Sequence, residues 1–255
     1  MIEDASVKLT ILCDDSLIKP LFSEHGFSVL VEKDSESAML FDTGASDVFL
    51  RNARILKKDL TKVEKIIISH GHYDHAGGLR YLSEIGKSFT VCVKEETFIP
   101  KYSGERFAGI DWQDLKTSFH FLLVKEKVQE ISRNIYIFGP VEMKNDFEEP
   151  EPNFYVAQAG KRTRDFFSEE LNLVIDQGDG VILITGCAHR GIVNTVEDTI
   201  KTFGKRIKIL IGGFHLYKSS VQKIEKVKDA LKGFKIDRIF PYHCTGELDI
   251  KFITL

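Results

Sequence analysis

The chain has 255 residues, of which 43% are hydrophobic and 29% are charged, and its formal net charge at pH 7 is −3. This composition predicts an ordinary folded protein and excludes a fibrous repeat or a largely disordered chain. The small net charge gives no strong attraction to nucleic acid or to an anionic membrane. No apolar run approaches the roughly 20 residues that cross a bilayer, and no cleavable apolar segment is recognisable at the amino terminus, so we expect a cytoplasmic protein.

Short runs rich in valine, isoleucine and phenylalanine, each followed by turn or polar residues, predict β-strands. The expected strands cover residues 7–12, 27–32, 38–42, 65–69, 89–93, 120–124, 134–138, 171–175, 180–185, 207–211 and 237–241. The last of these runs are continuously apolar, which is typical of strands that are buried on both faces of a sheet.

Two segments carry apolar residues at helical spacing, namely 190–203 and 220–234. The stripes comprise Ile192, Val193, Val196, Ile200 and Phe203 in the first and Val221, Ile224, Val227, Leu231 and Phe234 in the second. Alternation of these helices with strands predicts βαβ units in the second half. With no Gly/Ser-rich linker, we expect one domain over residues 1–255, in which two sheets pack together with helices outside.

Three connections are longer than usual for a compact domain: 98–118, 143–153 and 157–169. Loops of this length are usually functional or mobile, although solvated excursions are an equal alternative.

The strand expected at 65–69 runs into the segment HGHYDHAGG, which concentrates ligand-type side chains. His70 and His72, two apart in an extended segment, can point to the same side and hold one metal ion. Asp74 and His75 then turn toward a neighbouring position, as a helix begins near Ala76. Imidazole and carboxylate ligands without a cluster of thiolates suit zinc, iron or manganese at a catalytic site.

The four cysteines are too few and too far apart for a disulfide framework. Cys13 and Cys92 lie in apolar runs and are expected in the core. Cys187 and Cys244 are different, because each lies within two residues of a histidine.

Five segments together resemble the metallo-β-lactamase superfamily: FDTG (41–44), SHGHYDHAGGL (69–79), TGCAHRGIVN (185–194), GGFHL (212–216) and PYHCTG (241–246). The last three resemble a branch of metal-dependent hydrolases that includes the archaeal 7,8-dihydropterin-6-yl-methyl-4-(β-D-ribofuranosyl)aminobenzene 5′-phosphate synthases. The resemblance implies a four-layer αβ/βα sandwich, in which two mixed β-sheets carry helices on their outer faces.

The resemblance also implies a role for each matching residue. His70 and His72 would bind a first metal ion, and Asp74 with His75 a second. His243 would complete the second site, and Asp42 would orient a metal-bound histidine from behind. His189 is the best substitute for a first-site histidine that most relatives carry earlier in the chain.

The turn TGCAH departs from the common pattern, because Cys187 stands where most relatives have a bridging aspartate. Cys187 either ligates as a thiolate or lines the pocket, and Asp165 is another candidate for the missing ligand. His215 is either a general acid or substrate hydrogen-bond donor, or a histidine satisfied by backbone groups.

These features predict a hydrolase with one or two divalent metal ions, zinc being favoured and iron or manganese also fitting, that acts on an ester or phosphoester of a small molecule. Asp74 would orient the attacking water or accept its proton. Lys161, Arg162 and Arg164 either hold a substrate phosphate or are solvated charges paired with acidic residues at 146–151. The alternatives are a transferase resembling the pterin synthases, an iron redox protein and a non-catalytic metal-binding module. Nucleic acid is disfavoured as a partner, and the oligomeric state is open.

Overall fold

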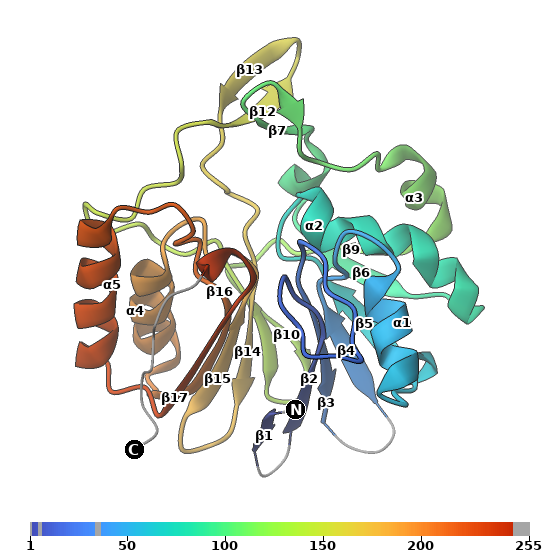
Figure 1. The fold of residues 1–255 in the computed structure, drawn as a ribbon, viewed down its shortest axis with the longest axis horizontal. Helices are drawn as coiled ribbons and strands as arrows, with labels where there is room; N and C mark the ends of the chain where they lie inside the picture. The colour runs from blue at the N-terminus through green and yellow to red at the C-terminus, as the bar shows by residue number, and fades with distance from the viewer. Residues whose placement is uncertain (1, 5–6, 34–36, 247–255) are drawn as a thin grey trace. The chain divides into compact units, whose positions relative to one another are not determined.

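The computed structural model describes residues 2–4, 7–33 and 37–246 (Figure 1). The chain forms two compact units. Unit 1 comprises Met1–Lys125 and Asn153–Arg164, and unit 2 comprises Glu126–Pro152 and Asp165–Leu255. Unit 1 contains two sheets and unit 2 contains one, and each unit has its own apolar core.

Unit 1 contains a seven-stranded sheet with the order β1-β2-β3-β4-β5-β6-β9. Its strands are β1 (Ile2–Asp4), β2 (Val7–Cys13), β3 (Ser28–Glu32), β4 (Ala38–Phe41), β5 (Val63–Ile67), β6 (Thr90–Val93) and β9 (His120–Leu123). Pairing is antiparallel from β1 to β4 and parallel from β4 through β5 and β6 to β9. The sheet is therefore mixed, and the carboxyl ends of β4 and β5 lie at the same edge.

The helical segments of unit 1 are α1 (Val48–Ile55), α2 (Tyr73–Ala76) and α3 (Gln113–Ser118), with 3₁₀ turns η1 (Leu60–Lys62), η2 (Gly77–Ile85) and η3 (Glu95–Phe98). Phe49 and Leu50 of α1 are buried in one core cluster with Leu40 and Ile66 of the sheet. The helix that was expected to begin near Ala76 begins three residues earlier and continues as η2.

A second, four-stranded antiparallel sheet in unit 1 has the order β13-β12-β7-β8. Its strands are β7 (Lys101–Ser103), β8 (Arg106–Phe107), β12 (Phe154–Gln158) and β13 (Lys161–Arg164). The prediction of long loops at 98–118 and 157–169 is therefore wrong, since both contain paired strands. Residues 143–153 contain no helix or strand, as expected.

Unit 2 contains a six-stranded mixed sheet with the order β10-β11-β14-β15-β16-β17. Its strands are β10 (Val128–Ser132), β11 (Ile135–Phe138), β14 (Asn172–Asp176), β15 (Val181–Thr185), β16 (Ile207–Gly213) and β17 (Arg238–Tyr242). β15, β16 and β17 are parallel neighbours. α4 (Ile192–Phe203) connects the first two and α5 (Val221–Gly233) the last two, so the predicted βαβ units are confirmed. A 3₁₀ turn, η4 (His243–Thr245), follows β17.

Helices α4 and α5 lie side by side on one face of this sheet (Figure 1). Val196 of α4 and Val227 and Leu231 of α5 are buried in one cluster with Leu183 and Leu210 of the sheet. Val221 was expected in the buried apolar stripe of α5, but its side chain is 76% exposed. It lies in the first turn of the helix, before the helix contacts the core.

The prediction of a mixed α/β fold with two large mixed sheets and helices is confirmed. None of the helices in the described ranges has the length and apolar character needed to span a membrane.

Candidate metal centre

The histidine-rich segment HGHYDH lies at the carboxyl end of β5, where the chain passes into α2. His72 is the residue immediately before α2 and has an extended backbone, while His70 lies in the turn before it. The ring nitrogens His70 Nε2 and His72 Nδ1 are 3.0 Å apart, and both side chains are buried. Two imidazole nitrogens that face each other this closely are suited to binding one ion.

Asp74 and His75 form a second pair in the first turn of α2, with Asp74 Oδ2 3.7 Å from His75 Nε2. On the other side of the ring, His75 Nδ1 lies 2.7 Å from Asp42 Oδ2. Donation of the Nδ1 proton to Asp42 leaves a lone pair on Nε2, the nitrogen that is beside Asp74. This is the arrangement that a metal-binding histidine requires.

Asp42 follows β4 and has a backbone φ of 59°, in the left-handed region that is strained for most residues. Its carboxylate also accepts hydrogen bonds from Ser69 N and Ser69 Oγ, both at 2.7 Å. Ser69 Oγ is in turn 2.9 Å from His70 Nδ1. One buried carboxylate therefore fixes His75 directly and contacts the residue that hydrogen-bonds His70.

The His70 ring has a pKa well below its usual value because it is fully buried, with repulsion from His75 and His72 adding to the effect of burial. A lowered pKa keeps the imidazole neutral, which is the form that offers a lone pair to a metal ion.

Gly78, in the motif, is required by backbone packing. A Cβ atom at this position would lie 2.1 Å from the carbonyl oxygen of Thr43. Thr43 in turn donates from its N–H and its Oγ1 to the carbonyl oxygen of His75, at 2.8 and 2.9 Å. Because Gly78 has no side chain, the turn after α2 can pack closely against the segment that follows β4.

His25 is a site residue that no sequence motif indicates. Its Nε2 lies 3.3 Å from Asp74 Oδ2, and its Nδ1 lies 2.8 Å from Asp15 Oδ2. Its side chain is 54% exposed. No local pattern indicates this contact, because His25 and Asp74 are far apart in the chain, His25 lying between β2 and β3 and Asp74 in α2.

In unit 2, the carboxyl ends of three parallel strands carry the remaining candidate residues. Cys187 and His189 follow β15, His215 follows β16, and His243 and Cys244 follow β17. The rings of His189 and His215 have centroids 4.3 Å apart. Two of the histidines, His215 and His243, adopt positive φ values of 48° and 50°. Strained backbone of this kind is concentrated at functional sites in proteins.

His189 is held by its surroundings in unit 2. Phe167 stacks on its ring with centroids 3.7 Å apart and planes at 11°. Glu170 accepts hydrogen bonds from the N–H groups of His189 and Arg190, at 2.6 and 3.1 Å. Burial raises the pKa of Glu170 to about 7, although these two hydrogen bonds oppose the shift. Asp165 Oδ1 accepts from the N–H of Phe167 at 2.8 Å, so it supports the stacking residue.

The four cysteines, all within the described part of the chain, are thiols. Burial raises the pKa values of Cys13 and Cys92, the latter to about 11, in agreement with their predicted place in the core. Burial also opposes ionisation of Cys244, but a hydrogen bond with Cys187 and the nearby rings of His243 and His215 lower its pKa well below the usual value.

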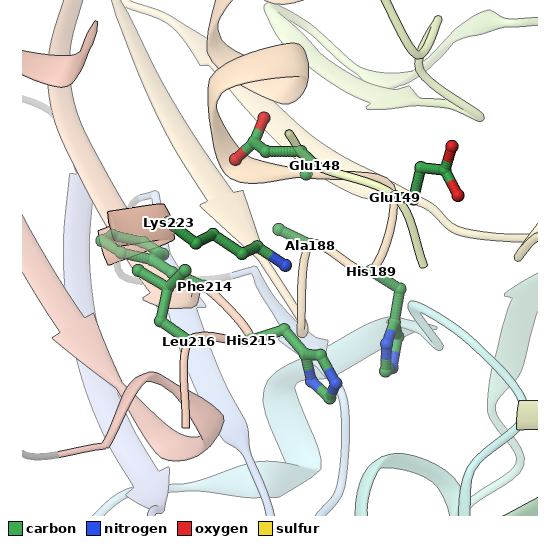
Figure 2. A pocket seen from close by; sticks show the side chains of 9 residues that line it. Glu148, Glu149, Ala188, His189, Phe214, His215, Leu216 and Lys223 are labelled. Carbon is green, nitrogen blue, oxygen red and sulfur yellow. The ribbon is translucent and has the colours of Figure 1, made fainter. Parts of the chain in front are cut away.

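A small pocket in unit 2 is shown in Figure 2, and it is lined by residues of both charges. His189 and His215 lie next to each other on one side, and the side chain of Lys223 extends toward the segment of Ala188. The other lining residues are Glu148, Glu149, Gly191, Phe214 and Leu216.

The basic residues Lys161, Arg162 and Arg164 lie on β13 of the small sheet in unit 1. Arg162 forms an ion pair with Glu105 at 2.8 Å and stacks 3.9 Å from the Tyr102 ring centroid. Its partner is therefore not one of the acidic residues at 146–151.

Two curated proteins and one solved structure are similar to this chain over most of its length. A protein of Methanocaldococcus jannaschii described as uncharacterized is 35% identical, covering 93% of this chain and 90% of the relative. The 7,8-dihydropterin-6-methyl-4-(β-D-ribofuranosyl)-aminobenzene-5′-phosphate synthase of the same organism is 30% identical, covering 94% of this chain and 88% of the relative. The crystal structure of a metal-dependent hydrolase of the β-lactamase superfamily is 44% identical, with a TM-score of 0.86, covering 95% of this chain and 89% of that one.

The family model of the metallo-β-lactamase superfamily matches residues 23–243, which include the whole HGHYDH segment and the strand ends of unit 2. This fold implies binding of divalent metal ions, and the buried imidazole and carboxylate groups described above are candidates to bind them. The extent of the family match and the identities to its relatives show that the chain belongs to the metallo-β-lactamase superfamily.

Proposed function

We propose that this protein is a metal-dependent hydrolase that acts on an ester or phosphoester of a small molecule. The observation that carries the proposal is the pair of buried nitrogens His70 Nε2 and His72 Nδ1, 3.0 Å apart, next in the chain to the Asp74–His75 pair. The 44% identical relative, which is described as a metal-dependent hydrolase, supports the same conclusion.

The donor set fits a divalent ion of the zinc, iron or manganese type. Its atoms are imidazole nitrogens and carboxylate oxygens, and Asp42 fixes the ring of His75 so that Nε2 is available. His189 and His243 are the further ligands that the family resemblance assigns, and they stay predictions. A bound divalent ion supplies a Lewis acid and lowers the pKa of water toward neutrality.

Asp74 is the residue that we assign to proton handling. Its Oδ2 is within 3.3 Å of His25 Nε2, so a proton accepted by the carboxylate has an adjacent imidazole that can share it. His25 in turn is hydrogen-bonded to Asp15. Asp74 is therefore in contact with a group outside the proposed metal ligands as well as with His75.

The polar groups that line the pocket of unit 2 favour an anionic or strongly polar substrate. Lys223 contributes an ammonium group, and His215 contributes an imidazole that can donate a hydrogen bond. Since Arg162 is paired with Glu105, we assign recognition of a substrate phosphate to Lys223 in preference to Arg162, whereas Lys161 and Arg164 keep their predicted role. His215 keeps the predicted role of hydrogen-bond donor to the substrate or leaving group.

A second candidate function is favoured by one comparison. The pterin ribofuranosylaminobenzene phosphate synthase is 30% identical over 94% of this chain. A transferase that forms a product of that kind would use the same polar pocket for a phosphate-bearing substrate.

The test is a panel of phosphodiesters, phosphomonoesters, lactones and thioesters, together with an assay for the synthase product. We expect turnover of one ester or phosphoester class that a chelator abolishes and that Zn²⁺ or Mn²⁺ restores. Asp74→Ala should lower kcat by about 100-fold or more, because proton transfer by a positioned group contributes about that much.

Asp179→Ala is the matched control, since Asp179 is an exposed carboxylate that pairs with surface lysine and arginine. It should retain full turnover. Chelator-resistant hydrolysis, or equal rates for the Asp74 and Asp179 variants, would contradict the proposed function, and synthase product without hydrolysis would favour the second candidate.

A further inference from the structure

Two thiols and one imidazole meet at the carboxyl ends of β15, β16 and β17. The ligand atoms of Cys187, His215 and Cys244 all lie within 4.8 Å of one another. Both cysteines are buried, whereas His215 is half-buried and lines the pocket of unit 2. An ion that reached the imidazole from the pocket would therefore have two sulfur atoms near the ring nitrogen that binds it.

The protein backbone holds these groups together without help from a ligand. Gly213 lies at the end of β16 and has no side chain. A Cβ atom on this residue would lie 2.7 Å from Cys244 Sγ and 3.3 Å from Cys187 Cα. The glycine thus leaves the space in which the two cysteines approach each other. Cys244 Sγ is 3.9 Å from the carbonyl oxygen of Cys187.

Two hydrogen bonds connect the turn after β17 to the turn after β16. The N–H of Tyr217 donates to the carbonyl oxygen of Cys244 at 3.0 Å, and the N–H of Phe214 donates to Thr245 Oγ1 at 3.0 Å. These two bonds connect residues on both sides of His215 to Cys244 and to its neighbour Thr245, and so restrict the position of Cys244 relative to His215.

The chemistry of this ligand set differs from that of HGHYDH. Thiolate sulfur selects soft and borderline ions, whereas carboxylates and imidazoles without sulfur also accept harder ions such as Mn²⁺. Tetrahedral zinc, with Zn–S near 2.3 Å, places two sulfur ligands about 3.8 Å apart. Groups already within 4.8 Å reach that geometry by moving about 1 Å.

We propose that Cys187, His215 and Cys244 form a binding site for one thiophilic metal ion, of the class Zn²⁺, Cd²⁺ or Cu⁺, in addition to the ligands supplied by HGHYDH. Three protein ligands leave a fourth position of a tetrahedral ion for water or for a small ligand, and His215 connects the cluster to the pocket that it lines. The imidazole of His215 can bind through one nitrogen and still donate a hydrogen bond from the other. The site does not depend on whether the protein is a hydrolase.

The test is titration of the full-length, reduced protein with Cd²⁺ alone, following the ultraviolet thiolate-to-cadmium charge-transfer band. We expect the band in the wild-type protein and its loss by at least half in Cys187→Ser and in Cys244→Ser. Cys92→Ser is the matched control, because Cys92 is a buried thiol on β6 whose pKa is raised to about 11, and it should leave the band unchanged. His72→Ala should also keep it.

A ¹¹³Cd NMR spectrum of the wild-type protein gives the same answer without a mutation, since its chemical shift reports the number of sulfur ligands. A resonance typical of two sulfur ligands is expected. Absence of both the charge-transfer band and that resonance, a band that survives both serine substitutions, or a band that His72→Ala removes would each overturn the proposal.

Discussion

Asp42 is the residue on which the geometry of the motif depends most. Its carboxylate accepts hydrogen bonds from Ser69 N, Ser69 Oγ and His75 Nδ1, each at 2.7 Å, and the whole group is buried. Its strained backbone, with φ of 59°, is paid for by these contacts. Removal of the side chain should therefore affect both the fold and any metal ion bound to His75.

Asp42→Ala is expected to weaken divalent metal binding by about 10- to 100-fold, because supporting hydrogen bonds to ligands typically contribute that much. It should also destabilise the fold by about 1–3 kcal/mol, since the buried N–H of Ser69 loses its acceptor. Chelator competition measures the first effect and urea unfolding the second.

Asp42→Asn separates charge from shape, because asparagine tolerates the left-handed backbone and keeps one acceptor oxygen. It should have an intermediate metal affinity. Wild-type affinity in the alanine variant would show that Asp42 does not support a ligand.

For single residues, contacts between neighbours in the chain can be predicted from the sequence, whereas contacts between residues far apart in the chain cannot. HGHYDH was identifiable because its ligand-type residues are adjacent, so their spacing alone places them together. His25 was not, since its contact with Asp74 is made only by the fold. Asp165 is a candidate for the ligand missing from the family pattern and Arg162 for holding a substrate phosphate, but their contacts with Phe167 and Glu105 cannot be predicted from the sequence.

Helix α4 is the element that begins directly after the turn carrying His189. Its N-cap residue is Gly191, which has no side chain to accept from the first turn. Glu148, which lies in the segment 143–153 and not in the helix, caps the helix instead. Its carboxylate accepts hydrogen bonds from Val193 N and Asn194 N, both at 3.0 Å. A carboxylate in this position is favoured by the partial positive charge of the helix N-terminus.

Burial raises the pKa of Glu148 above its ordinary value of 4.5, and the hydrogen bonds from Val193, Asn145 and Asn194 oppose the shift. The folded state therefore binds the proton more tightly than the unfolded state. The associated stabilisation is complete below pH 4.5 and is lost as the pH rises through the raised pKa.

Glu148→Gln should remove this contribution, so its free energy of unfolding should fall less steeply than that of the wild type as the pH rises above about 4.5. Urea unfolding at several pH values measures the difference. Glu149→Gln, an exposed neighbour, is the control and should follow the wild-type curve. Parallel curves for Glu148→Gln and the wild type would contradict the assignment.

Helices and strands that have a clear apolar pattern can be predicted from the sequence. Strands that form only because they pair with a neighbouring strand cannot. β15, α4, β16, α5 and β17 follow from apolar runs and helical stripes that bury the same core. β13 has the sequence KRTR and is largely exposed, so it has no apolar signal and forms only because it pairs with β12. α1 was also missed, although its Phe49 and Leu50 are buried.

Across the whole molecule, the candidate metal-binding residues share one structural position. In unit 1 they follow β4 and β5, and in unit 2 they follow β15, β16 and β17, which are parallel neighbours. Carboxyl ends of parallel strands meet at one edge of each sheet, where loops rather than core packing determine the side chains. The match to the family model covers residues 23–243, which include these strand ends in both units.

Mn²⁺ binding by the purified protein tests the central claim most directly, because thiolates bind this ion poorly and the imidazole–carboxylate ligands of HGHYDH bind it well. The wild-type protein and His120→Ala, which changes an exposed histidine on β9, are expected to bind one or two ions per chain with equal affinity. His72→Ala is expected to weaken binding by at least about 10-fold. A wild-type protein that binds no Mn²⁺, or a His72→Ala variant that binds it as tightly as His120→Ala, would contradict the account.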